Sequence, residues 1–194
     1  MAPPADRNAG IQEGGEADRL AMARLVGGED LALNEIMERW KSRLCTYLYR
    51  FTGNETTAHE LSEEAFVRLY QGRAKFRPDA NFSSWLFGIA ANLGRNHLRW
   101  QKRHPSLPLE AADDAIMEGN PARSAESREI ERAVRSAIAE LAPELREVLI
   151  LSEYERLTQA EIAGIAGSTI KAVERRLSRA RELLRKELSR FLRG

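Results

Sequence analysis

The sequence predicts an all-α protein in which two small helical domains are joined by an acidic linker. Apolar residues recur at steps of three and four along most of the chain, which is the period of an α-helix. Ala, Leu, Glu and Arg, which favour helices, are abundant, whereas runs of Val and Thr are few. The stretch 104–122 contains three prolines and no helical period, so we expect it to separate a unit at 20–103 from a unit at 123–194.

The composition excludes several functional classes. The chain has 194 residues, 43% of them hydrophobic, and 30 Lys and Arg against 29 Asp and Glu give a formal charge of +1. No apolar run approaches the ~20 residues that span a bilayer, and the first twenty residues contain no secretory signal, so we expect a cytoplasmic protein without membrane insertion. One cysteine, Cys45, and three histidines without ligand spacing lead us to expect no metal, no cofactor and no small-molecule substrate.

The first unit is expected to contain four helices after a disordered tail. Residues 1–19 are mostly polar and rich in Ala, Pro and Gly, which indicates the tail. Apolar residues at helical spacing predict helices over roughly 20–26, 30–52, 55–71 and 83–102. Gly53 separates the second helix from the third, and the proline-containing stretch 73–81 is expected to be a loop.

The second unit carries the most informative local pattern. It begins near Ser124, and Pro143 is expected at the first position of its second helix. Thr158 and Glu161 have the spacing of a capping box, which starts a short helix. Gly167 permits the left-handed turn that follows, and a basic helix begins after it. A short helix, a glycine turn and a basic helix are typical of the helix-turn-helix motif.

The charge is distributed unevenly. Segment 167–194 has nine Lys or Arg and three acids, 95–103 has four bases and no acid, and 104–131 has seven acids and two arginines. Two basic blocks therefore flank an acidic connector, which favours a polyanionic partner. In the basic helix of the helix-turn-helix, the residues expected to bind duplex DNA fall into two sets. Those facing base edges are Lys171, Glu174, Arg175 and Ser178, and those mostly meeting phosphate are Arg176, Arg179 and Arg181. Thr169, which is expected to cap the helix, is a further candidate for binding DNA.

The fourth helix carries a second, weaker signal for nucleic acid. Aromatic and basic residues alternate there, as they do in proteins that bind single strands. The candidate residues are Phe76, Phe82, Trp85, Asn92, Asn96, Arg99 and Arg103. The residues alone leave the alternative open that Trp85 belongs to the core and that Phe82 packs the loop.

Three motifs together resemble a known family, the extracytoplasmic function (group IV) sigma factors of the sigma-70 family. Segment 82–92 resembles the family's promoter-melting helix, and 60–70 resembles its helix that binds core RNA polymerase. Segments 141–149, 161–163 and 172–181 resemble its fourth conserved region, which reads the minus-35 element. The motifs occur in the family's order and cover roughly residues 20–192.

The resemblance implies a function and its partners. The protein would bind core RNA polymerase, recognise promoter DNA and promote its melting without being an enzyme, and an anti-sigma factor would control it. The polymerase contacts implied are Glu60, Leu61, Glu63 and Glu64. The minus-10 element would be bound by the Phe76–Phe82 loop and by Asn92. Two positions depart from the family pattern: Glu63 replaces a glutamine, and Asn96 replaces a common aspartate.

Two other classes of protein remain open from the sequence. An ordinary helix-turn-helix transcriptional regulator would explain the second unit, and a sigma-like mimic would titrate an anti-sigma factor without binding DNA. We find no nucleophile–base pair or phosphate-binding loop, so an enzyme is the least favoured class. Because about 19 extended linker residues span up to ~60 Å, we expect the units to move independently.

Overall fold

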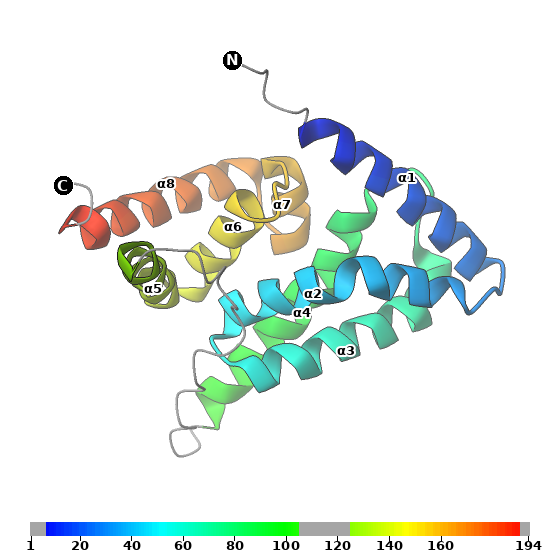
Figure 1. Cartoon of the computed structure of the whole chain (residues 1–194), viewed down its shortest axis with the longest axis horizontal. Coiled ribbons are helices and arrows are strands. Elements are labelled where there is room, and N and C mark those ends of the chain that lie inside the picture. The colour runs from blue at the N-terminus through cyan, green and yellow to red at the C-terminus, as the bar shows by residue number, and fades with distance from the viewer. Residues whose placement is uncertain (1–6, 105–124, 191–194) are drawn as a thin grey trace.

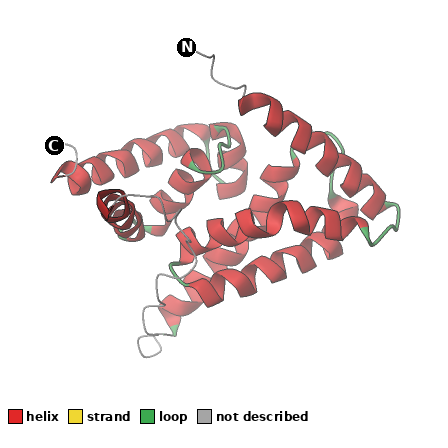
Figure 2. Cartoon of the chain, viewed as in Figure 1, coloured by secondary structure: helices red, strands yellow, loops and turns green. Residues whose placement is uncertain are grey.

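We describe the protein from a computed structural model, in which residues 7–104 and 125–190 are described. Every element in those two ranges is helical, with no strand among them (Figure 2). The α-helices are α1 Arg7–Val26, α2 Ala32–Thr52, α3 Glu55–Gly72, α4 Phe82–Arg103, α5 Ala125–Ala139, α6 Pro143–Glu153, α7 Gln159–Ala166 and α8 Ile170–Glu187. Short 3-10 turns follow α3 and α8 at Arg73–Lys75 and Leu188–Arg190. The all-α prediction and the positions of α2, α3, α4 and α6 to α8 are confirmed.

The first unit is a bundle in which α2, α3 and α4 pack side by side (Figure 1). Tyr47 and Phe51 of α2 and Phe87 of α4 are fully buried, and the Tyr47 ring centroid lies 6.1 Å from that of Phe51 and 5.1 Å from that of Phe87. Gly94 of α4 lies against the Phe51 ring of α2, where an added Cβ would lie 2.6 Å from the Cδ1 atom of Phe51. A side chain at this position would overlap the phenyl ring unless the ring or the helix moved, so the packing favours glycine here.

The N-terminal segment differs from the prediction of a disordered tail over residues 1–19. Helix α1 begins at Arg7, and residues 1–6 lie outside the described part of the chain. The reason is a long-range contact, since the Asp18 carboxylate is 2% exposed and accepts hydrogen bonds from two residues of α2. Arg39 Nε lies 2.8 Å away and Trp40 Nε1 lies 2.9 Å away. These pairs, with buried Met22 on the same helix, hold α1 against the bundle.

The second unit is built around α6 and α8. Pro143 occupies the start of α6, as the sequence predicts. Val148 and Leu151 of α6 pack with Val173 and Leu177 of α8, and all four are buried. The short α7 lies across one end of this pair (Figure 1).

The two units pack against each other in this structure, and their independent motion stays a prediction. The α6–α7 side of the second unit lies on α2 and α4 of the first (Figure 1). Arg146 Nη1 donates to the Phe51 carbonyl at 2.8 Å, and Arg95 forms an ion pair with Glu147. The partners are far apart in sequence, so local patterns did not reveal the contact. The linker, from residue 105 onward, lies outside the described residues.

Candidate nucleic-acid and polymerase surfaces

The helix-turn-helix motif is formed by α7 and α8, and both helix starts have the predicted caps. Thr158 Oγ1 accepts from the Glu161 backbone N–H at 3.3 Å, and a Glu161 carboxylate oxygen accepts from the Thr158 N–H at 2.8 Å. Gly167 adopts the left-handed conformation with φ 57°. Thr169 Oγ1 accepts from the Ala172 N–H at 3.2 Å. The Thr169 hydroxyl is therefore used to start α8, which is a structural role in addition to the DNA contact predicted for it.

One face of α8 is free to meet a ligand. Val173, Leu177 and Ala180 are buried, and the opposite face exposes the residues predicted to face base edges. These exposed residues are Lys171, Glu174, Arg175 and Ser178. An exposed, mainly basic face on the second helix of this motif is suited to the major groove.

The predicted phosphate-binding arginines of α8 have carboxylate neighbours in this structure. Arg179 pairs with Glu182 at 2.9 Å and Arg181 pairs with Glu153 at 2.6 Å, and all four side chains are exposed. Exposed pairs of this kind contribute only about 0–1 kcal/mol, so either arginine can exchange its partner for a phosphate. Arg176 is only partly exposed. Burial raises the pKa of the Glu147 carboxyl, and the charges of Arg95 and then of Arg176 oppose that rise.

Helix α4 presents a polar and basic stripe. Asn92, Asn96, Arg99 and Arg103 are exposed and follow steps of three and four, so they share one face. Arg99 Nη2 donates to Asn96 Oδ1 at 2.6 Å, and Arg103 Nε donates to the Arg99 carbonyl at 3.3 Å. The stripe therefore combines amide groups that form hydrogen bonds with guanidinium groups that are held by hydrogen bonds within the helix.

The aromatic residues that precede this stripe are packed rather than open. Phe76 is 9% exposed and Phe82 is 3% exposed. The Phe76 and Trp85 ring centroids lie 5.1 Å apart, and those of Trp40 and Phe82 lie 5.5 Å apart. In this structure the cluster joins the start of α4 to α2, so Phe76 and Phe82 do not offer the free ring faces that base stacking needs. Sequence alone allowed both interpretations, because an aromatic residue beside basic ones fits a core as well as a stacking platform.

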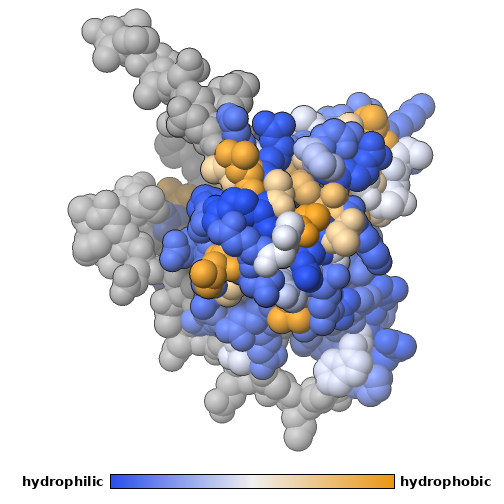
Figure 3. Space-filling view, turned by 90° about the vertical axis from the view of Figure 1, so that its right-hand side faces the viewer, coloured by the Kyte–Doolittle hydropathy of each residue, from blue (hydrophilic) through white to orange (hydrophobic). Residues whose placement is uncertain are grey.

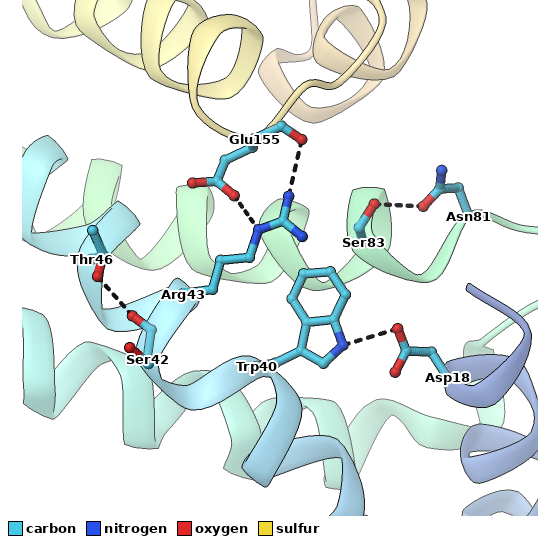
Figure 4. Close-up of polar contacts among 8 residues, drawn as sticks. All are labelled: Asp18, Trp40, Ser42, Arg43, Thr46, Asn81, Ser83 and Glu155. Carbon is cyan, nitrogen blue, oxygen red and sulfur yellow. Dashed lines mark hydrogen bonds and ion pairs between the residues drawn. The ribbon is translucent and has the colours of Figure 1, made fainter. Parts of the chain in front are cut away.

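A second cluster at the junction of the units was not predicted from the sequence (Figure 4). Arg43 of α2 donates to the Glu155 carboxylate at 2.6 Å and to the Glu155 carbonyl at 3.1 Å. Its guanidinium carbon also lies 4.9 Å from the centre of the Trp40 ring. Burial raises the pKa of the Glu155 carboxyl, and Arg43 opposes that rise. The two partners are 112 residues apart, so no local motif could have indicated the pair.

Glu161 links the helix-turn-helix to the start of α4. Its Oε1 accepts from Asn81 Nδ2 at 2.7 Å and from Ser84 Oγ at 2.8 Å. Burial acts to raise the pKa of Glu161, but the hydrogen bonds from Thr158, Ser84 and Asn81 outweigh it and bring the pKa below its usual range. A groove of about 600 Å³ beside this contact is lined by Asn92 on α4 and by Gly164 and Ile165 on α7. The polar and basic stripe on α4 therefore begins, at Asn92, next to α7.

Helix α3 carries the predicted polymerase contacts. Glu60 and Glu63 are exposed, and Leu61 and Glu64 are partly exposed. Glu64 forms an ion pair with Arg68 at 2.7 Å. The carboxylates of Glu60 and Glu63 are the more exposed ones. Glu63 also borders a groove of about 540 Å³ between α2 and α3, which the sequence did not reveal. The apolar residues that line this groove are Leu33, Met37, Phe66 and Val67.

No group of three or more His, Cys, Asp or Glu side chains within 7–104 and 125–190 is arranged to hold a metal ion. No helix in those ranges combines the length and the apolar character needed to cross a membrane. The face at the right of Figure 1 is mainly hydrophilic, with hydrophobic side chains in small separate groups (Figure 3).

A helix-turn-helix beside a second basic helix defines a DNA-binding protein of two helical units, and comparison with known proteins gives its family. Residues 36–104 match the model of sigma-70 region 2, and residues 131–184 match that of sigma-70 region 4. The RNA polymerase sigma-H factor of Pseudomonas aeruginosa is 30% identical, over 92% of this chain and 97% of that protein. The ECF RNA polymerase sigma factor SigW of Bacillus subtilis is 29% identical, over 83% and 91%. The chain belongs to the sigma-70 family, as an alternative sigma factor of the extracytoplasmic function class.

Solved structures agree with this fold. CnrH, in complex with the cytosolic domain of CnrY, superposes with a TM-score of 0.67 at 28% identity, over 89% of this chain and 97% of CnrH. The sigma factor RpoE of Bartonella quintana, in complex with the anti-sigma factor NepR, gives a TM-score of 0.70 at 19% identity, over 82% and 98%.

Proposed function

We propose that the chain binds core RNA polymerase in the cytoplasm, recognises a promoter through α8 and α4, and assists the opening of the duplex without being an enzyme itself. One observation carries the proposal: a correctly capped helix-turn-helix with an exposed basic face lies in the same chain as the polar and basic stripe of α4. Relatives named as RNA polymerase sigma factors cover almost the whole length of the chain, which supports it.

In the proposed complex, α8 reads the minus-35 element. The N-terminal half of the helix enters the major groove, where Lys171 and Arg175 are the exposed donors. A bidentate contact from arginine to guanine is worth about 1–3 kcal/mol of discrimination against a wrong base. Arg179 and Arg181, on the flank of the helix, exchange their surface carboxylate partners for phosphates.

The stripe on α4 acts at the minus-10 element. Asn92 and Asn96 have amide groups that donate to and accept from exposed base edges, and Arg99 and Arg103 bind the backbone. Capturing an unpaired base offsets part of the unstacking cost, which is a few kcal/mol per base. The chemistry of RNA synthesis belongs to the polymerase.

The exposed carboxylates of α3 provide the polymerase contact. Glu60 and Glu63 present negative charge beside the apolar groove between α2 and α3. This combination favours a basic partner with apolar anchor residues. Glu63, in place of the glutamine in the family pattern, increases the negative charge of this surface.

The proposal also includes an anti-sigma factor as a regulatory partner. The related CnrH was solved in complex with the cytosolic domain of another protein, CnrY. We propose that a comparable partner binds this chain and keeps it from polymerase until a signal releases it.

Transcription in vitro tests the proposal. Purified full-length chain and core polymerase are incubated with a library of genomic fragments, and new transcripts are mapped. We expect transcripts that require both proteins and that start downstream of one shared pair of sequence elements. The variant with Glu60→Lys and Glu63→Lys is the matched control, because it retains α8 and should give none.

The other two classes predict different results. A helix-turn-helix regulator would bind DNA fragments alone but would not copurify with core polymerase in competition with another sigma factor. A mimic would bind an anti-sigma factor and give neither transcripts nor a mobility shift of promoter DNA with polymerase.

A further inference from the structure

The exposed ring on α4 lies at the opposite end of the helix from the cluster of buried rings. Phe82 and Phe87 are buried and Trp85 is partly buried, whereas Trp100 is 50% exposed. An indole so exposed contributes little to packing within the unit. It is also the ring of α4 that is available to a ligand without any rearrangement of the core.

Trp100 stands in a row of rings along one flank of α4. His97, Trp100 and His104 follow steps of three and four. The Trp100 and His104 ring centroids lie 5.0 Å apart with planes at 23°, so His104 stacks on the indole. His97 is further away, at 6.5 Å and 37°. The indole is thus supported by its neighbour but remains half open to solvent.

The charged side chains on this end of α4 are of one sign. Arg99, Lys102 and Arg103 are exposed on the same end of α4, and the segment 95–103 contains no acidic residue. Asn96 lies one turn before Trp100. Aromatic rings between cations bind single-stranded nucleic acid, because bases stack on the ring while the cations hold the phosphates.

We propose that Trp100 is a stacking platform for an unpaired base of the melted promoter strand, with Arg99, Lys102 and Arg103 holding the adjoining phosphates. The inference deepens the proposed function and rests on it. It assigns to Trp100 the stacking role that the buried Phe76 and Phe82 do not offer in this structure. Since every base has a ring face, this contact adds affinity for single strands with little sequence preference.

The test compares Trp100→Ala, Trp100→Phe and the wild type in holoenzyme with core polymerase. Three DNAs are used: a duplex promoter, the same promoter with an unpaired minus-10 region, and the minus-35 duplex alone. Base–aromatic stacking predicts that Trp100→Ala weakens binding to the unpaired promoter roughly 10- to 100-fold. Trp100→Phe should retain most of the affinity, and affinity for the minus-35 duplex should not change.

Two controls separate stacking from other effects. Leu20→Ala removes a side chain that is 61% exposed on α1, so it matches the exposure without touching the α4 surface, and it should behave as wild type. Thermal unfolding of Trp100→Ala should coincide with the wild type. A single-stranded oligonucleotide should quench part of the tryptophan fluorescence of the full-length wild type and less of that of Trp100→Phe.

Several outcomes would overturn the inference. Equal affinity of Trp100→Ala and wild type for the unpaired promoter, together with equal quenching in both proteins, would remove Trp100 from the DNA surface. Equal losses on paired and unpaired DNA would make it a duplex contact, and loss of polymerase binding would make it a protein contact. If wild-type holoenzyme formed no promoter complex at all, the proposed function would fail, whereas the quenching of the free chain would still decide the role of Trp100.

Discussion

Arg175 is the exposed side chain of α8 on which sequence-specific recognition most depends. It lies on the same face as Lys171 and Ser178 and forms no ion pair among those found between the described residues. We expect Arg175→Ala to weaken binding to the correct promoter by about 1–3 kcal/mol relative to random DNA, since a bidentate base contact is lost. Quantitative mobility shifts of holoenzyme on both DNAs measure the difference.

Lys186→Ala, near the end of α8, is the control for this measurement. It removes one exposed positive charge from the same helix but lies outside the half that enters the groove. Its effect should be small and equal on both DNAs. A similarly uniform loss for Arg175→Ala would show that Arg175 only contacts phosphate.

Gly94 gives a prediction about packing at a single residue. An alanine Cβ there would lie 2.6 Å and 2.8 Å from two ring atoms of Phe51, so Gly94→Ala forces the ring or the helix to move. We expect a loss of about 1–3 kcal/mol in the free energy of unfolding. Gly164→Ala on α7 is the matched control, because its Cβ would meet nothing within 4 Å and alanine favours a helix by about 0.5–1 kcal/mol. Chemical denaturation of both variants should show opposite signs; equal stability would contradict the close approach.

At the scale of the element, α3 has two faces with different roles. Phe66 is 3% exposed in the core, so Phe66→Ala should cost about 3–5 kcal/mol and unfold the first unit. Glu60→Lys with Glu63→Lys changes only exposed side chains and should leave the unfolding transition unchanged while abolishing polymerase binding. Co-purification with core polymerase and circular dichroism check the two results. Normal polymerase affinity in the charge-reversed protein would exclude α3 as the binding surface.

Helices whose ends are set by neighbouring residues in the chain were predictable from the sequence. Helices whose position depends on residues far away in the chain were not. Helices α7 and α8 were predicted because Thr158, Glu161, Gly167 and Thr169 each act on neighbouring backbone. The start of α1 was missed because Asp18 pairs with residues of α2, and a lone aspartate in a polar stretch gives no sign of such burial.

The candidate site also contains features that the local sequence predicted and features that depend on distant residues. The exposed faces of α4 and α8 followed from helical spacing and charge. The burial of Phe76 and Phe82 did not, because their position depends on Trp40 of another helix. Glu147 and Glu155 were not singled out in the sequence, yet both are 4% exposed and each pairs with an arginine of the first unit.

At the scale of the whole molecule, the packed arrangement conflicts with simultaneous binding of both promoter elements. The minus-35 and minus-10 positions are about 25 base pairs apart, which is roughly 85 Å at about 3.4 Å per base pair. Here α7 contacts α4 directly, and Ser84 Oγ of α4 donates to Glu161 Oε1 of α7 at 2.8 Å. We therefore expect the units to separate when the chain engages polymerase and promoter.

The ion pairs between the units give a way to test this. Arg43→Glu with Arg95→Glu places carboxylates opposite Glu155 and Glu147, and the repulsion of buried like charges should open the structure. Small-angle scattering of the free chain should show a larger radius of gyration. Exchanging all four charges, with Glu147→Arg and Glu155→Arg added, should restore part of the compaction. An unchanged radius in the first variant, with both units folded, would show that these pairs do not hold the units together.

The contact between the units also sets how much protein is needed before transcription begins. If only separated molecules bind polymerase, the apparent dissociation constant is the intrinsic one divided by the separated fraction. With about one molecule in a hundred separated, polymerase would require roughly a hundredfold more sigma factor to be half saturated. Substitutions at Arg43 or Arg95 would then shift the abundance at which a promoter responds without altering any DNA contact, so the threshold of the response can change while its target sequence stays the same.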